Sequence, residues 1–253
     1  MSSITRFGNL TLKLPEGVEV SNSTENGEVI SLFDENGRVV IPEYVQVGLG
    51  YKTDKGKFKV THSLRSDNKT ISTNLSVLLS KYDVLYAIDT NKKKIDDIEY
   101  CISSRMLMQM ELTGEQLWEM KLIRLPAFIF TTPIEHEEKI GWSQFIEQEH
   151  LALNGKKIGI VTDHDLGHMP LYNQREKAIL DLGLLPENID FIYASADRDK
   201  GSPLNKAVMQ CDADSNLLLK QIYNKKMNLS ALANSESAFF DQSGSLVPRA
   251  KCN

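Results

Sequence analysis

Cysteine is scarce in this sequence, and its placement excludes two classes of protein. The chain has 253 residues and only three cysteines, which are Cys101, Cys211 and Cys252. An odd number of widely spaced cysteines does not form a disulfide framework, and no pair has the short spacing of a zinc-ligand motif. We therefore expect a reduced, cytoplasmic setting and no structural zinc site.

Long apolar runs and an excess of positive charge are also missing. No apolar run approaches the length needed to span a bilayer, and residues 1–7 lack the apolar core of a secretory signal. The formal net charge is -5, so the chain as a whole does not attract nucleic acid. Contact with nucleic acid would have to come from local clusters such as Lys92–Lys94. We expect a protein with no membrane partner.

What is present is an ordinary globular composition with a β-rich beginning. Hydrophobic residues make up 41% and charged residues 25% of the chain. Residues 9–14 alternate with the period of a half-buried strand, and residues 28–41 form a predicted hairpin around Asn36-Gly37. A second hairpin is predicted between 45–51 and 57–62. We expect a β-rich region over 1–73 that could offer a surface to a protein partner.

From residue 74 onward, the pattern changes to alternating helices and strands, which predicts an α/β domain over 74–227. The predicted helices cover 75–81, 112–120, 135–153, 173–182 and 203–223. The predicted strands cover 84–88, 98–110, 122–131, 158–162 and 189–195, with a polar turn at 90–94. Residues 228–253 form a polar tail that we expect to pack poorly. Its Leu246-Val-Pro-Arg stretch resembles a protease-site remnant and receives no functional weight.

Acidic residues stand where two of these strands end. The apolar run Ile158–Thr162 leads into Asp163 and Asp165, and the run Val84–Ile88 leads into Asp89. Ligands of open α/β sheets bind at the carboxyl ends of the strands. Carboxylates in one crevice repel each other unless a cation lies between them, and a hard divalent metal is the usual solution. We expect the two strands to be neighbours.

Each of these residues also has a plain structural interpretation. A single strand-end aspartate such as Asp89 is most often a turn or cap residue. Asp212 lies within a predicted helix and could face solvent. Asp197 and Asp199 are typical of a turn before the last helix. His164, with no cysteine near it, is not expected to bind zinc. The recurrence of acids at the ends of successive elements is what favours a site.

In their order along the chain, the acids resemble those of the ribonuclease H-like superfamily of metal-dependent nucleases. Those folds place an aspartate at the end of the first strand, before a β-hairpin. A helical acid follows, then an aspartate after the fourth strand and an acid in the last helix. The matching motifs are Ile88-Asp89-Thr90-Asn91, Thr162-Asp163-His164, and Asn205 with Cys211-Asp212. The resemblance covers about residues 80–225 and implies a mixed sheet flanked by helices.

The resemblance also implies the chemistry. Two Mg²⁺ or Mn²⁺ ions would bracket a scissile phosphate of a nucleic acid, DNA or RNA. The implied ligands are Asp89, Asp163 and Asp212, with Asp165 as a further ligand. A glutamate completes the set, for which we take Glu147, with Glu137 and Glu149 as alternatives. His164, His168 or Lys200 would assist proton transfer or product release.

Other interpretations stay open at this point. Residues 162–167 also resemble the Asp-x-Asp motif of TOPRIM domains, but that family needs a glutamate where Asp89 stands. PIN-domain nucleases share both aspartate motifs, but they usually end soon after the second one. A different class is a non-catalytic adaptor or regulator whose acids only decorate the surface.

Overall fold

The computed structural model describes the chain in segments, with side chains only from Leu78 onward. The described residues are 3–7, 10–14, 19–23, 29–33, 44–48, 50–52, 58–60, 63–64, 73–112, 118–131, 136–153, 155–163, 169–194, 203–230, 232, 237–240 and 246–247. Among the helices in these segments, none combines the length and hydropathy of a membrane span.

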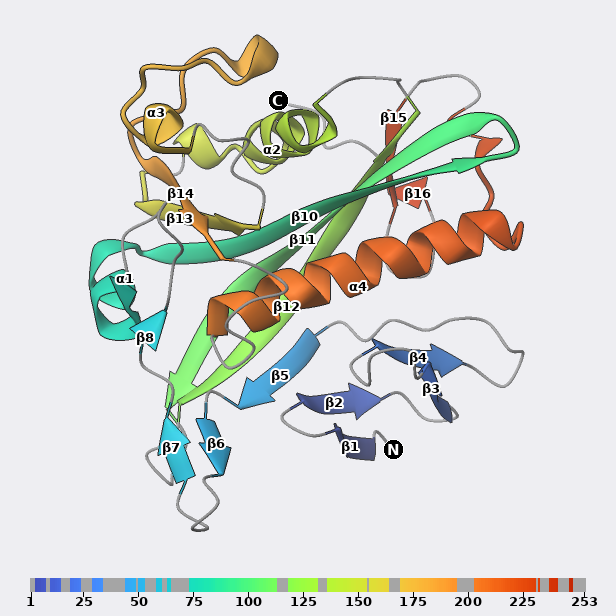
Figure 1. Ribbon diagram of the computed structural model, residues 1–253, viewed down its shortest axis with the longest axis horizontal. Coiled ribbons are helices and arrows are strands. Elements are labelled where there is room, and N and C mark those ends of the chain that lie inside the picture. Colours follow the sequence, from blue (N-terminus) through green and yellow to red (C-terminus); the bar gives the residue numbers. More distant parts are fainter. Residues whose placement is uncertain are drawn as a thin grey trace.

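A mixed β-sheet forms the centre of the molecule (Figure 1). Its central strands are β10 (Val84–Ile95), β11 (Ile98–Leu112), β12 (Trp118–Phe130), β13 (Ile158–Thr162) and β14 (Ile189–Tyr193). The first three are antiparallel neighbours, whereas β13 is parallel to β10 and β14 is parallel to β13. The spatial order is β12-β11-β10-β13-β14. This mixed sheet with flanking helices confirms the predicted α/β fold class.

The two long helices pack on opposite faces of this sheet. The helix α4 (Pro203–Tyr223) lies across β10 and β11, and α2 (Glu137–Gln148) contacts the same strands. Side chains alternate along β10, so Ala87 packs in one core cluster with Val208 of α4. Ile88, the next residue, packs in another with Trp142 of α2. Asp89 follows Ile88, so its side chain points to the face of the sheet that α4 covers.

Short helices and turns complete the α/β part of the chain. They are α1 (Leu75–Lys81), α3 (Met169–Asn173) and the 3₁₀ turns Leu151–Leu153 and Leu180–Leu182. The helices α1 and α4 and the strand β13 have the predicted bounds. Pro203 at the first position of α4 fits its start, because a helix needs no N–H there.

Strands from both ends of the chain join the same sheet. β5 (Tyr44–Gly48) pairs with β12, and β2 (Leu10–Leu14) links β5 to β1 (Ser3–Phe7). The remaining early strands form two-stranded pairs: β3 (Glu19–Ser23) with β4 (Val29–Phe33), β6 (Gly50–Lys52) with β7 (Phe58–Val60), and β8 (Ser63–Leu64) with β9 (Thr73–Asn74). The β6–β7 pair confirms the second predicted hairpin at its turn end only, because 44–48 pairs with β12 and β2 instead. In the first predicted hairpin, 29–33 pairs with β3, and 34–41 lies outside the described residues. The division of the chain into domains stays a prediction.

The tail predicted to pack poorly contributes to the core instead. β15 (Ser237–Phe240) pairs with β12, and β16 (Leu246–Val247) pairs with β15. Phe239 and Phe240 are buried, and each belongs to a different hydrophobic cluster. The prediction was wrong at these residues because it weighed the polar composition of the segment over its two adjacent aromatic side chains.

Residues 90–94 are strand rather than the predicted turn. Each pairs with a residue of β11, from Thr90 with Ser103 to Lys94 with Glu99, so the ladder holds polar residues in extended form. The turn falls at Asp96 and Asp97, whose φ angles of 47° and 67° suit a tight hairpin. The extra length of β10 matters for the site, because it carries the strand past the end of β13.

Two predicted helices are also wrong in part. Residues 118–120 belong to β12, where pairing with β11 and β5 overrides the local helical preference. Residues 174–179 form a loop between α3 and a 3₁₀ turn. Arg175 has a φ of 59° and donates hydrogen bonds to the carbonyls of Pro186 and Ile189. These side-chain bonds anchor the loop to β14 and to the turn that precedes it.

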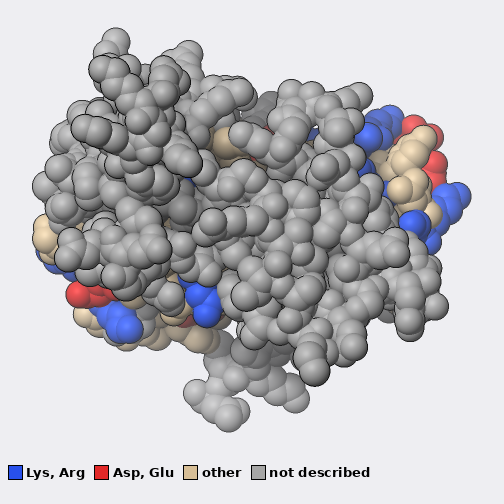
Figure 2. All heavy atoms as spheres, turned by 90° about the horizontal axis from the view of Figure 1, so that it is seen from below, with Lys and Arg blue, Asp and Glu red and all other residues tan. Residues whose placement is uncertain are grey.

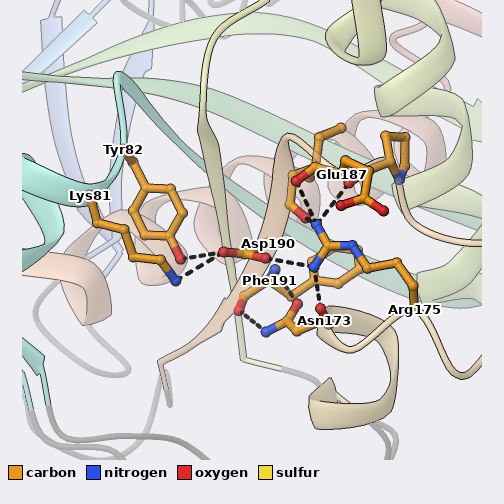
Figure 3. A network of polar contacts seen from close by, with 9 residues as sticks. Lys81, Tyr82, Asn173, Arg175, Glu187, Asp190 and Phe191 are labelled. Atoms are coloured by element: carbon orange, nitrogen blue, oxygen red, sulfur yellow. Dashed lines mark hydrogen bonds and ion pairs between the residues drawn. The ribbon is translucent and has the colours of Figure 1, made fainter.

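A polar network ties the sheet together at the end opposite the strand-end acids (Figure 3). Asp190 of β14 accepts hydrogen bonds from Tyr82 at 3.0 Å and Arg175 at 3.0 Å, and it pairs with Lys81 at 2.9 Å. Lys81 and Tyr82 lie just before β10, and Asp190 lies near the start of β14. The Asp190 carboxylate therefore connects the N-terminal ends of β10 and β14, which flank β13 in the sheet. The parallel strands are thereby held in register where the chain enters them.

Candidate active site

Asp89 and Asp163 meet at the carboxyl ends of two neighbouring parallel strands. Val84 pairs with Ile158 and Ala87 pairs with Val161. Continuing this parallel register by two residues on each strand places Asp89 opposite Asp163. Their side chains share a hydrogen bond. The sequence expectation that the two strands are neighbours is confirmed.

The helix α4 adds Asp212 to this pair. The amide nitrogen Nδ2 of Asn91 lies 2.9 Å from Asp89 Oδ2 and 2.8 Å from Asp212 Oδ1. Asn91 follows Asp89 by two residues on β10, so both side chains leave the same face of the sheet. The predicted mid-helix aspartate therefore faces the sheet and a buried acid, although it is half-buried itself.

A glutamate from α2 completes the group, and it is Glu138. A Cβ atom added to Gly141 would lie 2.6 Å from Ser103 Oγ and 2.7 Å from Thr90 Oγ1. The absence of that atom lets α2 approach β10 and β11 closely. Glu138, nearly one turn earlier, is 7% exposed, and its Oε2 has no hydrogen-bond partner among the described residues.

The electrostatics of the four acids show that they act on one another. Burial raises the pKa of Asp89 well above its ordinary value, and three acids raise it further: Asp163, Glu138 and Asp212. Burial, followed by repulsion from Asp163, raises the pKa of Glu138 to about 8. Each shift means that the charged form is disfavoured in the folded protein. A cation among these carboxylates would relieve the repulsion.

Glu147, the glutamate taken from the sequence, does not reach the three aspartates. It is exposed, and Gln144 donates a 3.4 Å hydrogen bond to it. Nine residues of α-helix separate it from Glu138, which turns its side chain by about 180° to the opposite side of α2. Glu138, and not the predicted Glu147, is therefore the α2 glutamate that lies near the three aspartates.

The two alternative glutamates have partners of their own. Glu137 pairs with Lys92 at 2.8 Å, and Glu149 lies 3.9 Å from the buried guanidinium of Arg105. Neither is among the main causes of the raised pKa of Asp89. The sequence did contain a pointer to Glu138, because it precedes the buried Trp142 by four residues and so lies on the same side of the helix.

Several other predicted site residues lie outside the described part of the chain. These are Asp165, His164, His168, Asp197, Asp199 and Lys200. Their assigned roles as a further ligand, proton-transfer groups or turn residues stay predictions.

The donor set suits a hard divalent cation in its chemistry. Four carboxylates supply oxygen ligands of the kind that Mg²⁺ and Mn²⁺ prefer, and Glu138 offers a buried oxygen without a hydrogen bond. Across the described residues, no group of three or more His, Cys, Asp or Glu side chains is placed so that it could hold an ion. The acids therefore fit the ion by the chemistry of their oxygens, and Asn91 stands between two of them.

Comparison with known proteins adds little to this picture. No protein-family model and no curated protein matches the chain. Among solved structures, the solution structure of the RNase H domain of PFV, a foamy virus, matches with a TM-score of 0.34 and 9% sequence identity. The match covers 53% of this chain and 93% of that chain. At this level it carries no argument, so the fold assignment depends on the strand order and the helix placement.

Proposed function

We propose that this protein is a divalent-metal-dependent nuclease that hydrolyses phosphodiester bonds in nucleic acid. The observation that carries the proposal is the meeting of four acids from four separate elements of the fold. Asp89 and Glu138 are buried there at a cost, because both have raised pKa values. Groups perturbed by burial and by specific charged neighbours cluster at functional sites.

In this proposal the four carboxylates hold Mg²⁺ or Mn²⁺, and Asp89 is central because it neighbours each of the other three. Bound ions would lower the pKa of an attacking water and stabilise the charge that develops on the phosphate. The chain's own contribution is to fix the acids on rigid elements. Two strand ends and two helices on opposite faces of the sheet converge on the place where the phosphate would lie.

The topology favours a ribonuclease H-like nuclease over the two other nuclease families. An antiparallel hairpin of β10 and β11 follows the first aspartate directly, unlike a PIN domain. The chain continues after Asp163 through β14 and the long helix α4, which supplies Asp212. Asp89 stands where a TOPRIM domain would need a glutamate.

The charged groups near the β10–β11 hairpin bear on how a nucleic acid would bind. Lys92 pairs with Glu137 at 2.8 Å, and Lys94 pairs with Asp97 at 3.1 Å. On the face shown in Figure 2, the described surface likewise carries basic and acidic side chains side by side. We propose that bound divalent ions supply much of the attraction for the phosphate, and DNA, RNA and hybrid all remain substrates to be tried.

The test is a nuclease panel with the full chain on single- and double-stranded DNA, RNA and RNA–DNA hybrid. Each substrate is incubated with Mg²⁺, Mn²⁺ or EDTA. We expect cleavage that needs the metal and falls at least about 100-fold in Asp89→Asn and Asp163→Asn. Glu147→Gln is the matched control, because it removes an exposed carboxylate of α2 and should leave cleavage unchanged.

Two other outcomes of the panel would count against the proposal. Cleavage that persists in EDTA, or that is insensitive to both aspartate variants, would contradict the site. No cleavage of any substrate would favour the non-catalytic adaptor.

A further inference from the structure

The side-chain amide of Asn91 lies among more acceptors than it can satisfy. Its nitrogen Nδ2 is 2.9 Å from Asp89 Oδ2, 2.8 Å from Asp212 Oδ1 and 2.5 Å from Ser215 Oγ. The backbone carbonyl of Asp212 lies at 3.5 Å. An amide nitrogen carries two hydrogens, so it cannot donate fully to all four oxygens.

The surroundings of Asn91 show that its nitrogen, rather than its oxygen, belongs at this point. Both carboxylate oxygens and the Asp212 carbonyl present lone pairs. Ser215 Oγ gives its own hydrogen to that carbonyl at 2.9 Å, so toward Asn91 it also presents lone pairs. A carbonyl oxygen in the same place would face only other acceptors.

Oxygens from two carboxylates, a hydroxyl and a backbone carbonyl around one point are the surroundings that a hard cation requires. We infer that the Asn91 amide is a positioning residue that stands in for a divalent cation between Asp89 and Asp212 and gives way when the ion binds. This inference rests on the proposed metal-dependent function. It adds a residue of the Asp89-Thr90-Asn91 motif to the site.

A second observation points to an ion in the same group. Glu138 is 7% exposed, and its Oε2 has no hydrogen-bond partner among the described residues. The charge of Glu138 is one of those that raise the pKa of Asp89, so its carboxyl group lies near the cluster. Hydrogen bonds from Thr90 offset part of the rise in the pKa of Glu138. The Asn91 amide bridges Asp89 and Asp212, and being neutral it cannot cancel the charge of any carboxylate.

The chemistry of asparagine suits a temporary occupant. Its hydrogen bonds are strong enough to hold two carboxylates together in the empty site, and an ion that binds both carboxylates can displace them. A lysine at this position would neutralise the acids permanently and compete with the metal at all times. A serine would be too short to bridge a strand and a helix.

The inference makes a thermodynamic prediction that a purely structural role does not make. Removing the amide destabilises the empty site, whereas the ion-loaded site, from which the amide has been displaced, loses nothing. Because the substitution destabilises only the metal-free state, the free energy of metal binding becomes more favourable by the same amount. In Asn91→Ala we therefore expect a lower melting temperature in EDTA, a larger gain on adding Mn²⁺, and an apparent Mn²⁺ affinity raised about fivefold.

The experiment uses the full chain, with thermal unfolding in EDTA and in saturating MnCl₂ and a Mn²⁺ titration followed by electron paramagnetic resonance. Asn216→Ala is the matched control, because Asn216 Nδ2 also donates to Asp212 Oδ1 at 2.9 Å but comes from the exposed side of α4. Its Mn²⁺ affinity should equal that of the wild type. Asn91→Leu is the second variant, which keeps a similar size, removes the donor without adding a charge and should also bind Mn²⁺ more tightly.

The outcomes separate this inference from the function on which it rests. An unchanged or weaker Mn²⁺ affinity in both Asn91 variants, with a wild type that binds Mn²⁺, would overturn the role of Asn91 alone. A wild type that Mn²⁺ neither binds nor stabilises would overturn the metal site and this inference with it. Tighter binding in the Asn91 variants and unchanged binding in Asn216→Ala would support it.

Discussion

The carboxyl group of Asp89 forms a hydrogen bond with Asp163 across the ends of two parallel strands. Burial, the charge of Asp163 and this bond all raise the pKa of Asp89. A cation between the two acids would relieve their repulsion. The relationship follows from the parallel register of β10 and β13, which the entry-end network around Asp190 holds in place.

Replacing Glu138 with glutamine should stabilise the metal-free protein at high pH. Because its folded pKa is about 8, against an ordinary value of 4.5, the wild-type group favours folding below pH 4.5 and loses that contribution as the pH rises through 8. In EDTA at pH 9 we expect Glu138→Gln to be more stable by on the order of 2 kcal/mol. Denaturant unfolding at pH 9 and pH 4.5 measures this, and the difference should vanish at the lower pH.

The matched variant Glu147→Gln should show neither effect, because Glu147 is exposed on the opposite side of α2. Equal stabilisation in the two variants would mean that general charge reduction, rather than the cluster, is responsible.

Asp212 and Asp214, two residues apart on α4, should respond in opposite ways to substitution. Asp214 is buried and accepts from Arg124 at 2.5 Å and 3.1 Å, so Asp214→Asn leaves a buried guanidinium without its counter-ion. We expect that variant to lose about 3 kcal/mol of stability. Asp212→Asn should change stability by less than about 1 kcal/mol and should abolish metal-dependent cleavage.

Chemical unfolding combined with the nuclease assay separates these two roles. A large loss of stability in Asp212→Asn, or an unaltered unfolding curve in Asp214→Asn, would reverse the assignment of the two residues.

Adding a methyl group at Gly141 should push α2 away from the sheet. The new Cβ would meet hydroxyl oxygens at 2.6 Å and 2.7 Å and Ser103 Cβ at 3.1 Å. We expect Gly141→Ala to cost about 1–3 kcal/mol and to weaken Mn²⁺ binding, because Glu138 moves with the helix. Gly159→Ala is the control, since its Cβ would meet the core side chains of Ile192 and Leu85 at 2.6 Å and 2.7 Å.

Both glycine variants should therefore unfold more easily, whereas only Gly141→Ala should bind Mn²⁺ less tightly. A titration that shows the same loss of affinity in both would point to general loosening of the sheet.

Much of the α/β scaffold could be predicted from local pattern. Val84–Ile88 and Ile158–Thr162 are apolar runs that end in acids, and the order of Asp89, Asp163 and Asp212 along the chain predicted elements that could meet. Contacts between distant segments decided the rest. Residues 118–120 had a local preference for helix, but pairing with β11 and β5 makes them strand.

The site residues that the sequence did not supply depend on packing. Glu138 enters the cluster because Gly141 allows a close helix–sheet contact, which no spacing rule reports. Asn91 was part of a predicted turn, and only the extension of β10 beyond β13 turns it toward α4. Arg105 is 1% exposed between Phe145 and Phe239, a placement that could not be foreseen for an arginine.

The entry-end network predicts a loss of stability in acid. Burial alone would raise the pKa of Asp190, but hydrogen bonds from Lys81 and Arg175 outweigh it and lower the pKa. A lowered pKa contributes stability above the unfolded value of 3.8, and that contribution is lost as the pH falls through the lower folded value. Asp190→Asn should therefore cost about 1–2 kcal/mol at pH 7 and much less near pH 2.

Urea unfolding of both proteins across this range is the measurement. A penalty that is independent of pH would show that the shape of the side chain matters there and its charge does not.

The central claim is that Asp89, Glu138, Asp163 and Asp212 form a divalent-metal site. Its most direct test is a Mn²⁺ titration of the full chain, followed by electron paramagnetic resonance, comparing the wild type with Asp89→Asn and Asp163→Asn and with Glu147→Gln as control. We expect saturable binding in the wild type and the control that weakens by at least about tenfold in each aspartate variant. Binding that is absent from the wild type, or equal in all four proteins, would contradict the claim.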